Sequence, residues 1–295
     1  MTGASGDEAG GRDSGPPPHL VPYQGSKRRL APAILAQLGE RRFSRLVEPF
    51  CGSAALTLAA AQRGVADRYL LADTYAPLMA LWRQVLASPM TLADEYEALW
   101  LSQFGAGAGH YGAVRARFHD EPTPAGLLYL LARAVKNAPR FGRDGRFNQS
   151  ADRRRHGVRP DRVRAQALQV AALLCGLCDV TTDDFRLVLE KIQPGDLIYL
   201  DPPYQGTSGG RDRRYVAGLS RSALAEALRP LVGRRDIGLL VSYDGRTGAR
   251  THGDELPLDL GLRRVELPAG RSSQATLHGR VEWTVESLYV GGCLG

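Results

Sequence analysis

Residues 45–73 read RLVEPFCGSAALTLAAAQRGVADRYLLAD, and this stretch decides the fold class. It begins with a short apolar strand pattern, continues through the turn-forming CGS and reaches an alanine-rich run that ends at Gly64. A second strand pattern, DRYLLAD, then carries Asp73 at its end. Strand, glycine loop, helix and strand in this order predict a β-α-β unit, the start of a doubly wound α/β sheet.

The same alternation returns near the middle of the chain. The run Leu197–Leu200, within DLIYLDPPY at 196–204, is apolar throughout, which predicts a central strand buried on both faces. A helix, a strand and a terminal β-hairpin with a long connection are then expected at 220–232, 237–245 and 262–290.

Composition divides the chain into three parts. Residues 1–18 are rich in Gly, Ser and Pro and have almost nothing apolar to bury, so a disordered leader is expected. Residues 91–170 show helical patterns and an arginine-rich stretch with little strand character, which predicts an inserted, mostly helical domain. Residues 19–90 and 171–295 then form the α/β domain.

The bulk composition limits the classes of function. No apolar run is long enough for a membrane span, and four cysteines in 295 residues are too few for a disulfide framework, so we expect a cytoplasmic protein. The formal net charge of +7 suits a polyanionic partner. A coding sequence that favours arginine over lysine gives the same surplus, so charge alone leaves the partner open.

The sequence Asp201-Pro202-Pro203-Tyr204 follows the apolar strand directly. Such a turn could serve transfer of a methyl group to the amino group of adenine. That amino group is a poor nucleophile because its lone pair is delocalised into the ring. Two acceptors, the Asp201 carboxylate and the Pro202 carbonyl, would draw that nitrogen toward tetrahedral geometry, and the prolines fix the direction of the carbonyl. Tyr204 offers a ring on which a flipped-out base can stack. The alternative is a proline-rich turn; ligands of open α/β sheets, however, bind at this end of a strand.

A cofactor loop is predicted between the first strand and helix, at Glu48–Ala54. Gly52 lets the backbone approach a ligand, and Asp73 follows at the spacing of an acid that meets ribose hydroxyls. The pyrophosphate fingerprint GxGxxG is absent, which disfavours NAD and FAD and suits a nucleoside without phosphates, such as S-adenosylmethionine. An ordinary β-α turn is the alternative. The stretch Pro22–Lys27 is either a third ligand segment or a solvated helix start.

Taken together, these segments resemble the DNA adenine methylase (Dam-type) family, amino-methyltransferases with motif order alpha. The resemblance rests on YQGSK at 23–27, VEPFCGSAAL at 47–56, LLAD at 70–73 and YLDPPY at 199–204. Matching positions inside the insert and near the C-terminus are Arg133, Asn137, Arg140, Gly145, Phe147, Asn148, VSYDG at 241–245 and ESLYV at 286–290.

The resemblance implies that the α/β part is a catalytic domain with the Rossmann-like sheet of S-adenosylmethionine-dependent methyltransferases. It implies that the insert is a target-recognition domain. It implies site-specific N6-methylation of adenine in double-stranded DNA, with S-adenosylhomocysteine as the second product. Asp201 is placed as the catalytic and cofactor-contacting acid and Asp73 as the ribose acid. The other expected cofactor contacts are Tyr23, Lys27, Phe50 and Gly52.

The chain departs from the family pattern in three places. Ala54 replaces the second glycine of the cofactor loop, and Tyr75 replaces an asparagine that often follows the ribose acid. Both substitutions bear on cofactor binding. Residues 149–152, QSAD, stand where V-P-x-G is usual, which bears on the shape of the recognition loop.

The arginine-rich stretch at 140–164 carries nine arginines and is the expected surface for duplex DNA. The alternative is a solvated basic loop. The residues predicted to contact DNA are Arg140, Arg143, Arg146, Asn148 and Arg153. We expect a monomer, and the presence of a restriction or defence-system partner stays open.

Other functions remain to be weighed. Cytosine N4 in DNA and ribosomal RNA bases use the same acceptor chemistry, and Ala54 and Tyr75 leave open a catalytically silent DNA-binding protein. Cys175 and Cys178 lie in a run that we expect to be helical, with no second pair, so neither a zinc nor a redox site is expected. No metal is expected.

Overall fold

The protein is described by a computed structural model that covers residues 15–142, 144–203, 219–271 and 282–295. Most of the expected leader, residues 1–14, lies outside the described residues.

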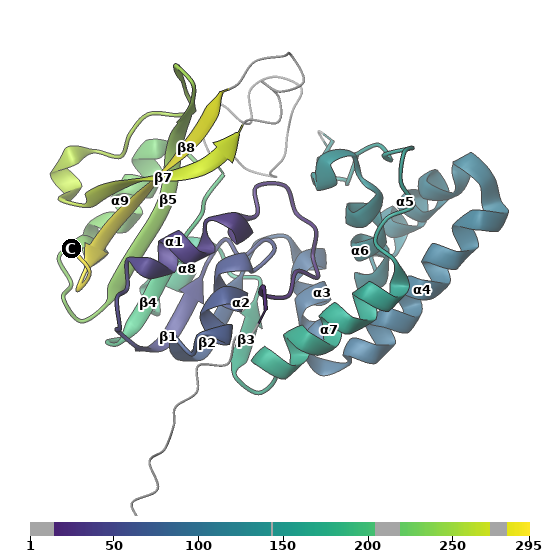
Figure 1. Cartoon of the computed structure of the whole chain (residues 1–295), viewed down its shortest axis with the longest axis horizontal. Coiled ribbons are helices and arrows are strands. Elements are labelled where there is room, and N and C mark those ends of the chain that lie inside the picture. Colours follow the sequence, from purple (N-terminus) through teal and green to yellow (C-terminus); the bar gives the residue numbers. More distant parts are fainter. Residues whose placement is uncertain (1–14, 143, 204–218, 272–281) are drawn as a thin grey trace, which may run out of the picture.

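A single mixed sheet forms the centre of the fold (Figure 1). Its strand order is β3-β2-β1-β4-β5-β8-β7, with the short β6 paired to β5. Strands β1 to β5 run parallel, and β8 is antiparallel to both β5 and β7. The predicted doubly wound α/β class is therefore confirmed, with the C-terminal hairpin added at one edge. The strands are β1 Phe43–Glu48, β2 Ala66–Ala72, β3 Cys178–Thr181, β4 Asp196–Leu200, β5 Gly238–Thr247, β6 Arg250–Thr251, β7 Arg263–Arg271 and β8 Trp283–Gly292.

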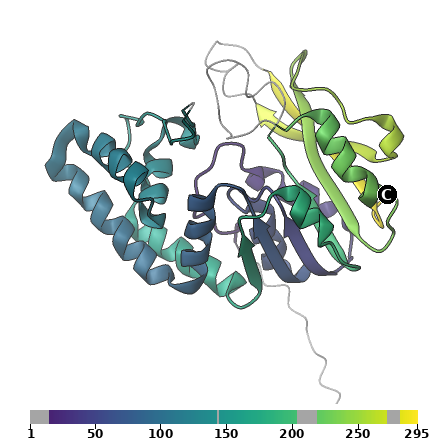
Figure 2. The ribbon, with the colours of Figure 1, turned by 180° about the vertical axis from the view of Figure 1, so that it is seen from behind.

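Helices cover both faces of the sheet. Helices α1 and α2 lie on the face seen in Figure 1, and α8 and α9 lie on the face seen in Figure 2. Their bounds, with the short 3-10 turns, are η1 Lys27–Arg29, α1 Ala31–Ala36, α2 Ala55–Gln62, α8 Phe185–Glu190, α9 Arg221–Val232 and η4 Leu258–Leu260.

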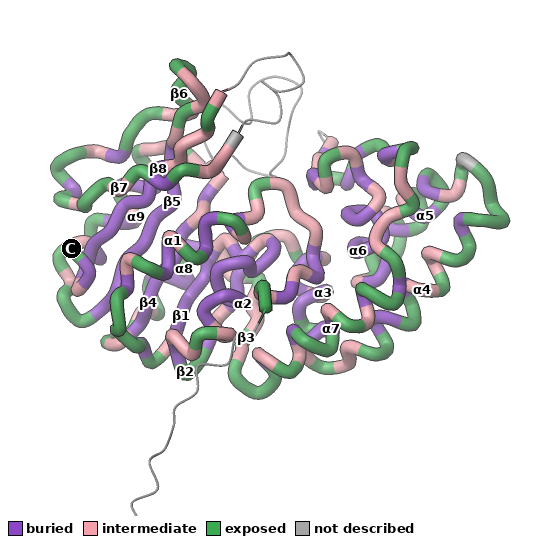
Figure 3. The backbone as a smooth tube through the Cα atoms, viewed as in Figure 1, coloured by how far each residue is buried: buried purple, intermediate pink, exposed green. Residues whose placement is uncertain are grey.

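The central strand β4 shows why the sheet is covered twice. All five of its residues are buried (Figure 3). Leu197 and Tyr199 belong to the hydrophobic core on one side, whereas Ile198 and Leu200 belong to the core on the other. Successive side chains of a strand point to opposite faces, so a continuous apolar run requires cover on both.

A helical lobe lies beside the sheet, between β2 and β3 in the chain (Figure 1). Helix α4 packs against both α6 and α7, and α3, which contacts the same two helices and β3, joins them to the sheet. The expected domain limits at 90/91 and 170/171 fall inside α4 and α7. The helices and turns are α3 Ala76–Ala87, α4 Pro89–Ala106, η2 Gly107–Gly109, α5 His110–Asp120, α6 Pro124–Arg133, η3 Val135–Asn137 and α7 Pro160–Leu174. Among the described helices none is both long and apolar enough to cross a bilayer.

The segment around Cys175 and Cys178 differs from expectation. It was expected to be helical, but α7 ends at Leu174 and Cys178 begins strand β3. Gly176 explains the change, because its φ of +75° is a left-handed conformation that ends helices. The four-residue strand after it is too short for a clear periodicity.

Candidate active site

A cavity of about 470 Å³ opens at the carboxyl ends of the parallel strands. From β1 the strand order continues through β2 and β3 toward one edge of the sheet, and from β4 through β5 toward the other edge. The strand order therefore reverses between the adjacent strands β1 and β4, which is a topological switch point. Open α/β sheets bind ligands at such a switch point. The cavity is lined by Tyr23, Gln24, Gly25, Ser26, Lys27, Glu48, Phe50, Cys51, Gly52, Ser53, Ala55, Asp73, Thr74, Tyr75, Phe141, Asp184, Phe185, Arg186, Asp201, Pro203 and Leu219.

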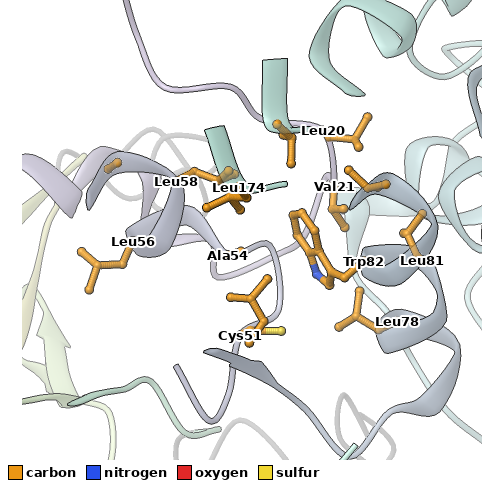
Figure 4. Close-up of a cluster of buried hydrophobic side chains, with 14 of the residues drawn as sticks. Leu20, Val21, Cys51, Ala54, Leu56, Leu58, Leu78, Leu81, Trp82 and Leu174 are labelled. Carbon is orange, nitrogen blue, oxygen red and sulfur yellow. The ribbon is translucent and has the colours of Figure 1, made fainter. Parts of the chain in front are cut away.

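The loop between β1 and α2 forms the floor of the cavity and is held from behind. Trp82 of α3 donates from its indole nitrogen to the Gly52 carbonyl at 3.0 Å. Figure 4 shows the Trp82 ring within a buried apolar cluster that also includes Cys51 and Ala54. Gly52 and Ala54 both adopt positive φ, +45° and +49°. The position where the resembling family has its second glycine is therefore left-handed in this chain, a conformation that glycine adopts more readily than alanine.

The N-terminal segment covers this loop. A Cβ atom added to Gly52 would lie 3.5 Å from Cδ1 of Tyr23, so the tyrosine ring rests against the glycine backbone. The hydroxyls of Ser53 and Ser26 are 2.8 Å apart. Tyr23 and Gly52, both predicted as cofactor contacts, therefore lie next to each other in the cavity lining.

Asp73 stands directly after β2 and faces the cavity. Its Oδ1 accepts a hydrogen bond from the backbone nitrogen of Tyr75 at 3.0 Å. Burial raises the pKa of Asp73 to about 6, and backbone hydrogen bonds from Tyr75 and Gly52 oppose that rise. The carboxylate is thus held in place while one side stays open to the cavity.

Asp201 follows β4 and carries an ion pair. Lys27 Nζ lies 2.9 Å from Asp201 Oδ1 and 3.2 Å from Glu286 Oε2 of β8. Burial raises the pKa of Asp201 to about 6; the positive charge of Lys27 lowers it, and the negative charge of Glu286 raises it. Among the described residues nothing bonds Asp201 Oδ2. Pro203 lines the cavity and Pro202 is buried beside it, whereas Tyr204 lies outside the described residues.

A second buried acid lies behind the loop. Glu48 ends β1 and its Oε2 accepts from both the backbone nitrogen and the hydroxyl of Thr57, at 3.2 and 2.6 Å. Burial raises the pKa of Glu48 to about 8, and the two Thr57 bonds oppose the rise. At neutral pH this side chain is therefore mostly uncharged, unlike Asp201.

Two aromatic pairs flank the cavity. Phe50 and Phe185 have ring centroids 5.1 Å apart, and Tyr75 and Phe141 are 4.9 Å apart in an edge-to-face arrangement. Phe185 was not predicted, because it follows the unrecognised strand β3. Had that strand been found, Asp184 and Phe185 would have stood at its carboxyl end, as Asp73 does for β2.

Of the residues predicted to contact DNA, the four that the structure describes do not line the cavity: Arg140, Arg146, Asn148 and Arg153. The first three belong to a hairpin in which Asn148 donates its backbone N–H to the Arg140 carbonyl at 2.7 Å, and Phe141 is bridged to Phe147. Arg146, Asn148 and Arg153 are exposed, Arg140 is half-buried, and Arg143 lies outside the described residues.

Two other arginines of the basic stretch form ion pairs with an acid of the same stretch. Arg154 and Arg155 both pair with Asp152, at 3.0 and 3.4 Å, and Arg155 also donates to the Ala134 carbonyl. Asp152 stands where the family pattern has glycine, so at this position the chain has a carboxylate that pairs with both arginines.

The sheet and the cavity at its switch point define a Rossmann-like methyltransferase domain. Residues 23–244, most of the chain, match the model of the D12 class N6 adenine-specific DNA methyltransferases, and the chain belongs to that family. Its substrate is DNA, and the modified group is the N6 amino group of adenine. Membership implies S-adenosylmethionine as the methyl donor.

Two relatives are named for the same activity. The Retron Ec67 DNA adenine methylase of Escherichia coli is 26% identical over 67% of this chain and 71% of its own length. The DNA N-6-adenine-methyltransferase of Escherichia phage P1 is 27% identical over 86% of this chain but only 33% of its own length. Among solved structures, a precorrin 8w decarboxylase of Methanobacterium thermoautotrophicum aligns over 90% of this chain and 89% of its own, with 13% identity and a TM-score of 0.39. A score this low has no bearing on fold or function.

Proposed function

We propose that the chain methylates a flipped-out adenine at specific sites in double-stranded DNA, with Asp201 as the acceptor for the amino group. The observation that carries this proposal is the shared cavity of Asp73, Phe50, Lys27 and Asp201. Asp73, an acid suited to ribose, follows β2, and Asp201, an acid suited to an amino group, follows β4; these two strands flank β1.

The cavity fits S-adenosylmethionine in size and chemistry. Its volume lies within the range of small-molecule sites, roughly 300–1,000 Å³. Asp73 would accept from the ribose hydroxyls, Gly52 would lie under the ligand without a Cβ to obstruct it, and Phe50 with Phe185 would contact the purine or methionine portion. When bound, the cofactor would supply a methyl carbon attached to a positively charged sulfur; the adenine nitrogen would bond to that carbon as the carbon–sulfur bond breaks and S-adenosylhomocysteine leaves.

The protein groups prepare the adenine nitrogen for this bond. Lys27 holds Asp201 through Oδ1, so Oδ2 can accept one N–H of the amino group. The Pro202 carbonyl would accept the other. The hydrogen bonds to both acceptors strengthen as positive charge develops on the nitrogen. Interactions that are stronger in the transition state than in the ground state are those that accelerate a reaction. After methylation Asp201, with a pKa near 6, is suited to hold the released proton.

The hairpin around Arg146 would contact the DNA. The exposed side chains of Arg146 and Arg153 are available for phosphates, with Arg140 and Asn148 at the base of the hairpin. On this proposal the lobe of α4–α7 with the hairpin is the target-recognition domain, and the sheet with its covering helices is the catalytic domain.

The setting of the enzyme follows from its substrates and relatives. DNA and S-adenosylmethionine meet in the cytoplasm, where we place the protein as a monomer. One relative is named as a retron methylase, which motivates a search for a restriction or defence-system partner.

Calorimetry with S-adenosylmethionine tests the cofactor site. The wild-type protein should bind it, and Asp73→Ala should weaken binding at least tenfold while Asp67→Ala, at an exposed acid on β2, leaves it unchanged. Absence of binding by the wild-type protein would favour a catalytically silent DNA-binding protein. Equal binding by Asp73→Ala would move the ribose contact elsewhere.

A further inference from the structure

Tyr75 and Phe141 join two distant parts of the chain at the cavity. Tyr75 precedes α3, two residues after Asp73, and Phe141 belongs to the hairpin of the helical insert. Their ring centroids are 4.9 Å apart at an interplanar angle of 70°, the edge-to-face geometry that aromatic pairs prefer. Both rings line the cavity, so the insert supplies part of its wall.

Phe141 is fixed from behind by the insert itself. It is only 8% exposed, its ring lies 6.4 Å from that of Phe147, and Phe147 lies 6.5 Å from Phe118 of α5. A line of aromatic rings therefore runs from the helical lobe to the edge of the cavity. Movement of the hairpin would carry the Phe141 ring with it.

A backbone contact joins the same two parts nearby. The Gln24 nitrogen donates to the Asn137 carbonyl at 2.9 Å, and Gln24 also lines the cavity. Asn137 adopts a φ of +51°, and its side-chain amide donates to the Leu131 carbonyl at the end of α6. The insert is thus attached to the cavity at two points, one polar and one aromatic.

We propose that Tyr75 and Phe141 act as a pair of cofactor-positioning residues, through which the DNA-recognition insert closes the Asp73 side of the cofactor cavity. The pair gives Tyr75 a role of its own at a position where the resembling family often has asparagine. Its rings exclude water beside Asp73 and offer an apolar edge to a nucleoside. The identity of this ligand rests on the proposed function.

A double-mutant cycle on cofactor binding tests the pair. Calorimetry with S-adenosylhomocysteine and no DNA would compare the wild type with Tyr75→Asn, Phe141→Leu and the double variant. Each single variant should bind about tenfold more weakly, and the double variant should be no more than about twofold worse than the weaker single one, because the rings act together. Tyr75→Phe, which keeps the ring, should retain binding.

Phe104→Leu is the matched control, since Phe104 is an aromatic residue of the same insert that belongs neither to this line of rings nor to the cavity lining. It should change the dissociation constant less than about twofold. The pairing would be overturned if the two single effects multiplied in full, if Phe104→Leu weakened binding equally, or if Phe141→Leu bound normally. Each of these results would leave the cofactor assignment intact. Failure of the wild type to bind would overturn both. If Phe141→Leu does not fold, by thermal melting, Tyr75→Asn and Tyr75→Phe still decide the role of the ring.

Discussion

Lys27 Nζ lies 2.9 Å from Asp201 Oδ1, which joins the first motif of the chain to the acid that follows the central strand. Lys27 is only 6% exposed, and its second carboxylate partner, Glu286, comes from β8. A buried lysine beside a half-buried acid favours the charged form of both. On the proposed mechanism, the positive charge of Lys27 opposes the rise in pKa that burial causes and so favours the ionised Asp201 that accepts from the amino group.

Activity should fall at acid pH. Ionised Asp201 can accept an N–H through either oxygen, whereas protonated Asp201 carries a hydrogen on one of them. Its pKa is raised to about 6. The turnover number at saturating cofactor should therefore be constant above about pH 7 and fall tenfold per unit below about pH 6. Saturation removes the contribution of Asp73, whose pKa is also about 6. A turnover number that stays flat down to pH 5 would contradict this role of the carboxylate.

Changing Lys27 to Gln should move that acid limb upward. The positive charge of Lys27 lowers the pKa of Asp201, so its removal should raise the midpoint of the pH–activity profile by about one pH unit or more. One unit corresponds to about 1.4 kcal/mol of lost stabilisation of the ionised carboxylate. Lys191→Gln is the matched control, because Lys191 pairs with Asp183 at 2.8 Å on the surface. An unchanged midpoint in Lys27→Gln would show that the pair does not set the ionisation of Asp201.

Glu48→Gln should be tolerated, in contrast to Glu48→Ala. With a folded pKa of about 8 against an ordinary value of 4.5, folded Glu48 keeps its proton between these pH values while the unfolded chain loses it. The free energy of unfolding of the wild type therefore decreases as pH rises through this window. Glutamine does not titrate, so the stability of Glu48→Gln relative to wild type should rise by up to about 1.4 kcal/mol per pH unit.

Thermal melting of both Glu48 variants and the wild type at pH 5 and 8 measures this effect. Glu48→Ala should melt below the wild type at both values, because Thr57 loses its acceptor. A constant difference between Glu48→Gln and the wild type would mean that Glu48 is ionised in the folded protein.

Substitutions at Ala54 should separate backbone conformation from side-chain size. Ala54→Gly removes the strain of a positive φ, worth about 1 kcal/mol, and should leave stability and cofactor affinity equal or higher. Ala54→Val places a branched side chain at the same φ and in a fully buried position, and should cost 2 kcal/mol or more, by a rough estimate. Chemical denaturation of both variants checks the order; destabilisation by glycine greater than by valine would contradict it.

The parts of the fold that follow from local pattern were predictable. The unit β1-α2-β2, the buried strand β4 and the hairpin of β7 and β8 each have a periodicity or turn residues that identify them. Strand β3 was not found, because four residues after a helix give too little pattern and Gly176 was not recognised as the helix end. Phe185 was missed for the same reason.

Motifs in the sequence predicted many of the residues that line the cavity, but not the long-range contacts around them. Tyr23, Lys27, Phe50, Gly52, Asp73 and Asp201 were each expected at a cofactor site, and all line one cavity. The parts played by Glu286 and Phe141 depend on how β8 and the insert pack against the sheet. No local pattern encodes such packing.

The most direct measurement is the identity of the modified nucleoside. Purified wild type and Asp201→Ala would be incubated with plasmid DNA and S-adenosylmethionine, and the digested DNA analysed by mass spectrometry. The wild type should form N6-methyladenine, and Asp201→Ala should form at least a thousandfold less while binding DNA and melting much as the wild type does. N4-methylcytosine as the sole product, or N6-methyladenine formed at a comparable rate by Asp201→Ala, would contradict the assignment of Asp201 as the acceptor for adenine.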